Sequence, residues 1–364
     1  MKCIVFLLFI CVACTGRHTN SVVPSIHYDF STVSTESIQE HIKEIKLIPM
    51  EIVDDGLFRN PDKVIVKDSL IYIGDYFTSS IKIFDINGRY INSISKKGRG
   101  YGEYLEMRNF TIDDNYIYII DNYNHMVHIY SRLAYTYIES KQISFVAWDM
   151  AALNNGDFLF TFIPYPTGKV NLEQPNYKIF ITGNDFIIKD KMYQYSAKSS
   201  EPLGYKSYFV ELPDRTIFSS FTFDGITEFK SSPEDSKQIG FTYDVPIPNK
   251  YRFQNPDLSK NKWTYMISTP QITDNYIALD LVVDDHWESF VYSIKSQVLM
   301  ANSKEPNGTI FFTPICTIDN KFVSLIRSIE EYECLVLNGM PDSNPKIREN
   351  IEKGGYVMLF YHLD

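Results

Sequence analysis

The sequence has few cysteines. Five occur among 364 residues, and only Cys316 and Cys334 lie beyond residue 14. So few thiols exclude a disulfide-rich scaffold and a zinc ribbon. Two interpretations of Cys316 and Cys334 stay open: a disulfide that joins neighbouring strands, or two buried free thiols.

Positive charge is also scarce. The chain carries 35 Lys and Arg against 45 Asp and Glu, which gives a formal net charge of −10 and a pI near 5.3. Binding to nucleic acid without sequence preference needs a basic face, so this balance argues against a nucleic-acid partner. Residues 96–99 (KKGR) form one local basic spot, which we interpret as a solvated turn.

Several motifs that mark known chemistry are missing. The sequence contains no H-E-x-x-H zinc motif, no G-x-S-x-G nucleophile elbow and no sialidase-type S-x-D-x-G-x-T-W box. The spacing of His125 and His128 places them on different faces of a strand, so we expect no shared metal ion there. The sequence therefore predicts neither a metal site nor a cofactor.

Aromatic residues are abundant instead, and they occur in a repeated pattern. The 26 Tyr and 25 Phe outnumber the 17 Gly and 17 Pro, which favours β-structure. Residues 65–75 (IVKDSLIYIGD) and 111–121 (TIDDNYIYIID) match without a gap at an offset of 46 residues. A period of about 40 to 50 residues made of short strands is typical of a β-propeller blade.

A polar turn followed by an apolar run marks this repeat along the chain. Asp and Asn suit such turns because they tolerate left-handed backbone geometry. Six markers occur, at Asp68-Ser69, Asp114-Asn115, residues 154–157, residues 213–215, Asp274-Asn275 and Asp319-Asn320. They predict an all-β fold, a six-bladed β-propeller with four-stranded antiparallel blades, over residues 35–364.

The ends of the propeller region carry further signals. We expect the C-terminal apolar run 356–361 to close the ring by pairing with residues 45–51, because an unpaired edge would otherwise stay exposed. Residues 35–51 fit either a helix, by the spacing of Ile38, Ile42 and Ile45, or a strand over residues 45–50. A helix is predicted at residues 345–353, where Gly354-Gly355 ends it.

The first residues form a predicted export signal. Lys2 precedes an apolar run of ten residues at 4–13, too short to span a bilayer as a helix. The run ends in Cys11-Val12-Ala13-Cys14, which resembles the lipobox of bacterial lipoproteins, whose signal is cut before a cysteine that is then lipidated. We therefore predict a signal peptide at 1–13, a lipidated Cys14 and a flexible polar tether over 14–34. The alternative is an ordinary secretory signal that is cut nearby.

A glycine-rich segment after the first repeat carries a more specific resemblance. The hairpin 84–91 (FDINGRYI) leads into residues 98–104 (GRGYGEY). These segments resemble a six-bladed, NHL-like β-propeller lipoprotein family of Bacteroidetes, with Tyr101 in place of the usual Pro. The resemblance covers most of the chain. It implies a propeller on a lipid anchor at the outer membrane, and it implies no known reaction.

The matching residues of that segment are Gly98, Gly100, Gly102, Glu103 and Tyr104. The G-x-G-x-x-G spacing of a nucleotide-binding loop is absent, and no helix follows to receive a pyrophosphate. We predict a structural turn with residues at positive φ, in which Glu103 accepts backbone N–H bonds.

Two groups of acidic residues are candidates for a site. Asp75 and Asp121 hold the same position in two repeats, so they either cap a loop or ligate a cation at a channel mouth, and their repetition favours the cap. The cluster Asp284, Asp285, His286 and Trp287, followed by Glu288, has the side chains for acid–base chemistry or for stacking on a sugar. A polar hairpin loop is expected there as well. We retain these first four residues as candidate ligand-binding residues.

These observations predict a lipid-anchored, monomeric binding or interaction module of the cell envelope. Its contacts would be the membrane, through the lipid anchor, and an envelope protein or glycan bound by loops on one face. Residues 15–18 lack an acidic run that resembles a surface-export signal, which favours the periplasmic side of the outer membrane. The alternative is an enzyme that acts on a carbohydrate or lactone in the central cleft, with dispersed Glu, Asn and Asp ligands like those of lactonase-like propellers.

Overall fold

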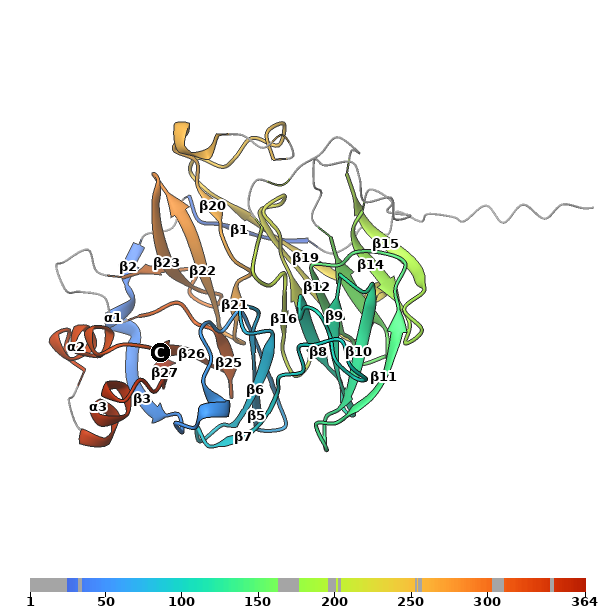
Figure 1. Cartoon of the computed structure of the whole chain (residues 1–364). Helices are drawn as coiled ribbons and strands as arrows, with labels where there is room; N and C mark the ends of the chain where they lie inside the picture. The colour runs from blue at the N-terminus through green and yellow to red at the C-terminus, as the bar shows by residue number, and fades with distance from the viewer. Residues whose placement is uncertain are drawn as a thin grey trace, which may run out of the picture.

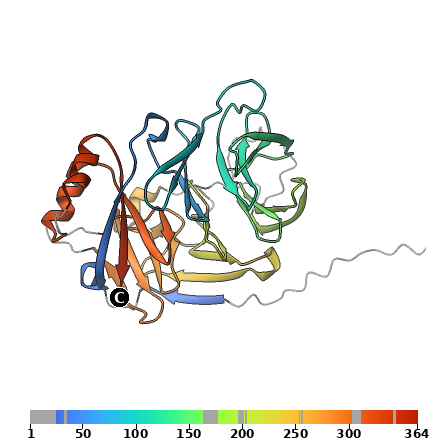
Figure 2. The same cartoon turned by 90° about the horizontal axis from the view of Figure 1, so that it is seen from below.

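Six β-sheets surround a central axis, and each forms one blade of a ring (Figure 1 and Figure 2). The structure, a computed structural model, describes residues 25–31, 35–162, 177–195, 201, 204–252, 254, 257–302, 311–340 and 344–364. In each blade the chain runs from an inner strand beside the axis outward through antiparallel neighbours. The predicted all-β fold, a six-bladed propeller with four-stranded blades, is confirmed.

Blades 1 to 3 are built from consecutive strands. Blade 1 contains β4 (Lys63–Lys67), β5 (Leu70–Asp75), β6 (Ser80–Asp85) and β7 (Tyr90–Ile94). Blade 2 contains β8 (Asn109–Ile112), β9 (Tyr116–Asp121), β10 (Met126–Ser131) and β11 (Tyr137–Gln142). Blade 3 contains β12 (Asp149–Ala152), β13 (Phe158–Thr161), β14 (Tyr177–Thr182) and β15 (Ile188–Gln194).

Blades 4 to 6 also take up strands from the beginning of the chain. Blade 4 contains β16 (Phe209–Glu211), β17 (Thr216–Phe218), β18 (Gly225–Phe229) and β19 (Lys237–Thr242). Blade 5 contains β20 (Tyr265–Met266), β21 (Gln271–Ile272), β22 (Tyr276–Val283), β23 (His286–Ser293) and β24 (Leu299–Ala301). Blade 6 contains β25 (Cys316–Ile318), β26 (Lys321–Ile326), β27 (Val357–Leu363) and β3 (Ile42–Pro49).

The six polar markers all lie in the turn between the first and second strands of a blade. Asp68 and Ser69 have φ values of 49° and 61°, and Asp319 and Asn320 have 48° and 60°. Two successive left-handed residues define the turn that matches the natural twist of a hairpin, and Asp and Asn adopt it at low cost. At these two markers the turn geometry accounts for the Asp, Ser and Asn residues that the sequence shows.

Closure of the ring joins the two ends of the chain. Strand β3 pairs antiparallel with β27, with Pro49 opposite Val357 and Ile45 opposite Tyr361. The predicted closure by residues 45–51 is therefore confirmed. Residues 38–49 adopt both of the predicted alternatives, since the short helix α1 (Ile38–His41) leads directly into β3.

Two further strands of the N-terminal segment lie on the outer edges of blades 4 and 5. Strand β1 (Ser25–Asp29) pairs in parallel with β19, and β2 (Thr35–Ser37) pairs in parallel with β24. The predicted tether was drawn to residue 34, but its residues 25–29 belong to a sheet. The outer strand of a blade has free backbone donors and acceptors, and β1 satisfies them. Strands β1, β2 and β3 together are called the N-terminal strap below.

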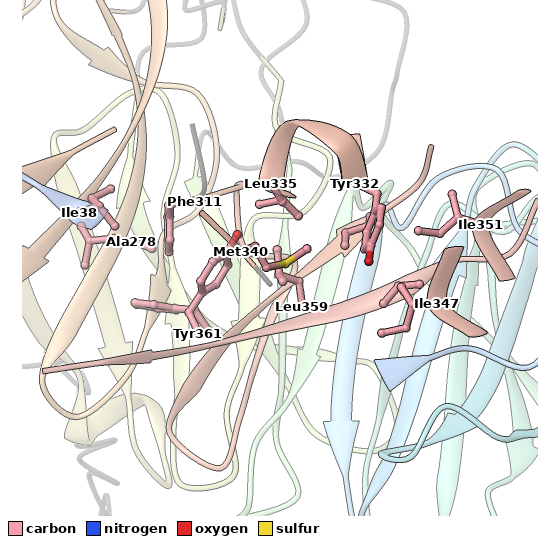
Figure 3. Packing of buried hydrophobic residues seen from close by; sticks show 14 of the residues in the cluster. Ile38, Ala278, Phe311, Tyr332, Leu335, Met340, Ile347, Ile351, Leu359 and Tyr361 are labelled. Atoms are coloured by element: carbon pink, nitrogen blue, oxygen red, sulfur yellow. The ribbon is translucent and has the colours of Figure 1, made fainter. Parts of the chain in front are cut away.

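Apolar side chains fill the space between neighbouring blades and under two helices. Helices α2 (Ile329–Leu337) and α3 (Pro345–Glu352) lie between β26 and β27 and cover the outside of blade 6 (Figure 1). Tyr332 and Leu335 of α2 and Ile347 of α3 are buried together with Leu359 of β27 (Figure 3).

Helix α3 confirms its prediction. Helix α2 was missed, although Ser328 followed by Glu331 is a capping pattern, and the Ser328 hydroxyl does accept a hydrogen bond from the Glu331 N–H. Three short 3-10 turns (Asp54–Gly56, Pro233–Asp235 and Leu258–Lys260) complete the described elements.

Candidate functional site

The glycine-rich segment 98–104 is a structural turn. Glu103 folds back over it and accepts a hydrogen bond from the Gly100 N–H at 2.7 Å, as predicted. Of the three glycines only Gly102 has a positive φ, of 72°. A Cβ at Gly98 would contact the Glu103 carboxylate, so a larger residue there would make that side chain shift. The Tyr104 hydroxyl then donates to the carbonyl of Ser79, which fixes the segment against blade 1.

Asp75 and Asp121 are buried turn caps. The Asp121 carboxylate accepts backbone N–H bonds from Leu105 at 2.8 Å and Tyr123 at 3.0 Å, and Asp75 accepts the corresponding bonds from Arg59 at 2.7 Å and Phe77 at 3.0 Å. Each carboxylate thus holds the second turn of its own blade against the loop that enters the blade. The cap interpretation of these repeated aspartates is the one that their contacts support.

A buried ionic network closes the axis between blades 1 to 4. The Lys63 ammonium lies 2.9 Å from Asp149 and 3.0 Å from Glu211, and the Thr111 hydroxyl donates to Glu211. Burial alone would lower the pKa of Lys63, but the two carboxylates outweigh that effect and raise it above its usual value. The inner strands of blades 1, 3 and 4 are therefore joined by ion pairs, and Thr111 links blade 2 to them through a hydrogen bond.

Blades 5 and 6 leave a cleft beside that network. The inner strand of blade 5 is interrupted between β20 and β21 by residues 267–270, which include Pro270. Proline removes a ladder donor and keeps the strand from continuing. The cleft that results has a volume of about 920 Å³ and reaches from Lys63 and Asp62 of blade 1 to Phe312 before blade 6. Its size lies within the range of small-molecule sites.

Asp280 forms the polar floor of the cleft. Its Oδ1 accepts hydrogen bonds from the hydroxyls of Ser289 at 2.8 Å and Thr313 at 3.1 Å, and its Oδ2 accepts one from Ser268 at 3.0 Å. Burial raises the pKa of Asp280 above its usual value, although these hydroxyls and the Trp287 indole act in the opposite direction. In the described part of the chain no salt bridge reaches this carboxylate.

Asp280 was not among the predicted site residues, and a signal for it is present in the repeat. Asp75 and Asp121 stand seven positions after Asp68 and Asp114, whereas Asp280 stands six positions after Asp274. Side chains alternate between the two faces of a strand, so a shift of one residue places Asp280 on the opposite face from the caps. The departure from the repeat, rather than the repeat itself, marks the site.

The structure divides the predicted cluster 284–287 into two parts. Asp284 and Asp285 form the two-residue turn between β22 and β23, with φ values of 50° and 65°, and Asp284 pairs with Lys262 at 2.6 Å. His286 and Trp287 are the first residues of β23 rather than part of a loop, and both line the cleft with Glu288. Trp287 lies opposite Val282 on the cleft side of the hairpin and is 66% exposed. The cluster is thus half structural turn and half cleft wall.

The charges around the cleft are arranged in pairs. Lys206 before blade 4 lies 3.0 Å from Asp62 before blade 1, and Arg327 lies 3.1 Å from Glu331 of α2. The first pair joins the loops that precede blades 4 and 1, whereas the second lies within one segment, between the end of β26 and helix α2. Among the described residues, each of these two positive side chains at the rim has its own carboxylate.

Other expectations concern thiols, metals and membranes. Cys316 and Cys334 are both free thiols, and burial raises the pKa of Cys316 to about 12. Among the described residues no group of three or more His, Cys, Asp or Glu side chains is arranged to hold a metal ion. No helix in the same residues has the length and apolar character to cross a membrane. The predicted signal peptide and Cys14 lie outside the described residues.

The fold and the cleft define a class: a six-bladed propeller whose axis is closed on one side by an ionic network and opened on the other by a ligand-sized cleft. Within that class, the family model DUF4934, a domain of unknown function, matches residues 25–353, and the chain belongs to this family. No curated protein matches the sequence.

Two solved structures from Bacteroides share the architecture. A candidate exported protein of Bacteroides fragilis is 17% identical, covers 94% of this chain and 100% of its own, and has a TM-score of 0.74. A member of the DUF4221 family from Bacteroides vulgatus is 9% identical, covers 89% and 97%, and has a TM-score of 0.50. At these identities the likeness concerns the fold.

Proposed function

We propose that the protein is a lipid-anchored binding module of the cell envelope that holds its ligand in the cleft between blades 1, 4, 5 and 6. The observation that carries the proposal is the cleft itself, with the buried Asp280 and the exposed Trp287 on one wall. A propeller without a site could close its whole axis in the way that the ionic network joins blades 1 to 4. A buried carboxylate without a cationic partner costs stability, and such groups gather at functional sites.

The anchor part of the proposal rests on the sequence. The apolar run that ends in Cys14 resembles a lipobox, and the similar protein of Bacteroides fragilis is a candidate exported protein. We propose the periplasmic side of the outer membrane and a monomeric state. Replacement of Cys14 by Ala is expected to move the protein from the membrane fraction to the soluble fraction, as measured by fractionation and immunoblotting. Retention of the variant in the membrane would exclude anchoring through Cys14.

Binding through the cleft is tested by capture from the native cell envelope. The tagged mature protein, with and without Trp287→Ala plus Asp280→Asn, is incubated with envelope extract, and captured protein and glycan are quantified. We expect a captured species that the double variant loses. The matched control is Tyr123→Ala, which removes an aromatic side chain of similar exposure (73%) from the corresponding turn of blade 2 and should change nothing. If the double variant captured as much as Tyr123→Ala, binding in the cleft would be contradicted.

An enzyme that acts on a carbohydrate or lactone is the second candidate, and Asp280 is the observation that favours it. A carboxyl group whose pKa is raised by burial holds its proton at higher pH and suits general acid catalysis. Hydrolysis of a panel of lactones and aryl glycosides by the wild type, lost in Asp280→Asn, would establish this activity. Equal, background rates for both proteins would leave binding as the function.

A further inference from the structure

We infer that the cleft binds a neutral saccharide, with one sugar face on Trp287 and sugar hydroxyls on the Ser268, Ser289 and Thr313 hydroxyls around Asp280. The inference rests on the proposed function of the cleft and adds the chemical class of its ligand. Three features of the cleft wall support it: an exposed aromatic side chain, a set of directed hydroxyl groups, and paired charges at the rim.

The first feature is a change of character along one face of blade 5. Ala278 and Val291 lie opposite each other on β22 and β23, and both are buried in the apolar cluster shared with blade 6. Two residues further along the same face, Asp280 lies opposite Ser289, and the next residue of β23 on that face is Trp287. The interface between blades 5 and 6 is therefore apolar at one end and opens into a polar, aromatic wall at the other.

Trp287 provides a flat apolar surface at the mouth of this wall. Its side chain is 66% exposed, although exposure of a large aromatic side chain to water is unfavourable. A sugar ring presents C–H groups on its faces and hydroxyls around its edge. Stacking on an indole covers the face and leaves the hydroxyls free for polar partners. A single aromatic wall suits a ring face better than it suits a quaternary ammonium group, which is typically enclosed by several aromatic side chains.

The hydroxyl groups around Asp280 are directed by its carboxylate. Each of the three donates its one proton to a carboxylate oxygen, and Ser289 and Thr313 also lie 3.0 Å apart. A hydroxyl that has used its proton keeps lone pairs that accept further bonds. The wall therefore presents acceptors at fixed positions beside Trp287. A ligand with several hydroxyl donors matches this arrangement.

The charges at the rim and at the floor argue against an anionic ligand. Lys206 is paired with Asp62, and Arg327 with Glu331, so neither cation is offered to an anionic group without breaking a pair. The floor itself is a carboxyl group, which would repel phosphate or carboxylate on a ligand. A polyanion is therefore disfavoured both at the mouth and at the floor.

The test measures binding of defined probes to the mature protein. Neutral probes are gluco-, manno-, xylo- and N-acetylglucosamine oligosaccharides; charged probes are heparin fragments, oligogalacturonate, choline and spermidine. Binding is followed by calorimetry and by tryptophan fluorescence, to which Trp287 contributes as one of three Trp residues. We expect binding of at least one neutral series and none of the charged probes. Failure of every neutral series, or binding of charged probes alone, would overturn the inference.

For the oligosaccharide series that binds, variants test the role of each residue in the cleft wall. Trp287→Ala is expected to weaken binding about tenfold and to remove the fluorescence change, whereas Trp287→Phe keeps part of the affinity. Asp280→Asn, which keeps the shape of the side chain, is expected to weaken binding while the protein stays folded by circular dichroism. Tyr123→Ala serves as the control with unchanged affinity. Unchanged affinity in Trp287→Ala would refute the stacking geometry.

Different results would contradict binding in the cleft and the saccharide inference. If envelope capture depends on Trp287 and Asp280 while every neutral sugar fails, the cleft binds a ligand of another class and only the saccharide inference is lost. If capture does not depend on the cleft residues, binding in the cleft is itself refuted.

Discussion

The two sides of the ring bury carboxylates in opposite ways. On the side of blades 1 to 4, Asp149 and Glu211 face the Lys63 ammonium, and Asp121 is surrounded by backbone N–H groups. On the side of blades 5 and 6, Asp280 is held by hydroxyls, and its neighbourhood is open to the cleft. The closed side uses acidic groups to join blades. The open side keeps one at a cost to stability, which is the arrangement expected of a binding site.

A comparison of Asp121 with Asp280 shows the same difference in their pKa values. Burial tends to raise the pKa of Asp121, but hydrogen bonds from His128, the Leu105 N–H and Asn124 outweigh it and hold the pKa below its ordinary value. For Asp280 burial dominates and the pKa is raised. The two residues lie in the second strands of their blades, one position out of register. An aspartate at one position of the second strand thus caps a turn, and an aspartate one position earlier, on the opposite face of the strand, lies in the cleft.

The largest expected effect on stability comes from breaking the network of the closed side. Lys63→Met leaves Asp149 and Glu211 buried without their cation, so we expect a loss of about 4 kcal/mol in the free energy of unfolding. Urea unfolding measures it. Lys67→Met is the matched control on the same strand, because Lys67 pairs with the exposed Asp114 and should contribute at most about 1 kcal/mol. Equal effects of the two changes would contradict a stabilising role for the network.

The next effect comes from the cap of blade 2. Asp121→Ala leaves several buried N–H groups without an acceptor, and we expect a loss of about 3 kcal/mol at neutral pH. Since the folded pKa is lowered, this contribution is present above about pH 4 and is lost as the pH falls through the folded pKa. Unfolding at a series of pH values measures both quantities. Asp190→Ala, on the exposed outer strand of blade 3, should change stability by less than about 0.5 kcal/mol.

The smallest effect on stability, with the opposite pH dependence, is expected at the open side. The pKa of Asp280 is raised in the folded state, so its favourable contribution is fully present below about pH 4 and is lost as the pH rises through the folded pKa. Asp280→Asn should therefore be about 0.5 to 1 kcal/mol more stable than the wild type at pH 7 and lose this advantage in acid. Asp285→Asn, at the exposed tip of the same hairpin, is the control. If the wild type instead gained stability relative to Asp280→Asn between pH 4 and pH 7, the pKa of Asp280 would be lowered, not raised, in the folded state.

Much of the fold could be predicted because blade architecture depends on local chemistry. Asp68-Ser69 and Asp319-Asn320 occupy left-handed turns that few other residues accept, and a polar turn stands at the same place in every blade. The closure by β3 followed from the need to cover an edge. Helix α2 was missed because it is inserted between the second and third strands of blade 6, outside the repeated pattern of strands and turns.

The site was predicted only in part, since it depends on distant residues. Trp287 and His286 were selected for their chemistry, and they do line the cleft. Asp284 and Asp285 were selected for the same reason and form the turn. The pairing of Lys63 with Glu211, and the contact of Thr313 with Asp280, join different blades. Such contacts depend on how the blades pack around the axis, which one sequence does not specify.

The N-terminal strap determines how the propeller would carry mechanical load. Ser25 lies beside Gln238, at the end of blade 4 where β18 turns into β19, and the loops around the cleft mouth lie at the other ends of the blades. A pull on residue 25 along β1 is resisted by all five residue pairs between β1 and β19 at once, in shear. Beyond them, β2 and the seven pairs of β3 with β27 share the strain. A chain held at its N-terminus would thus take tension in its outer edges and leave the inner strands around Asp280 undisturbed.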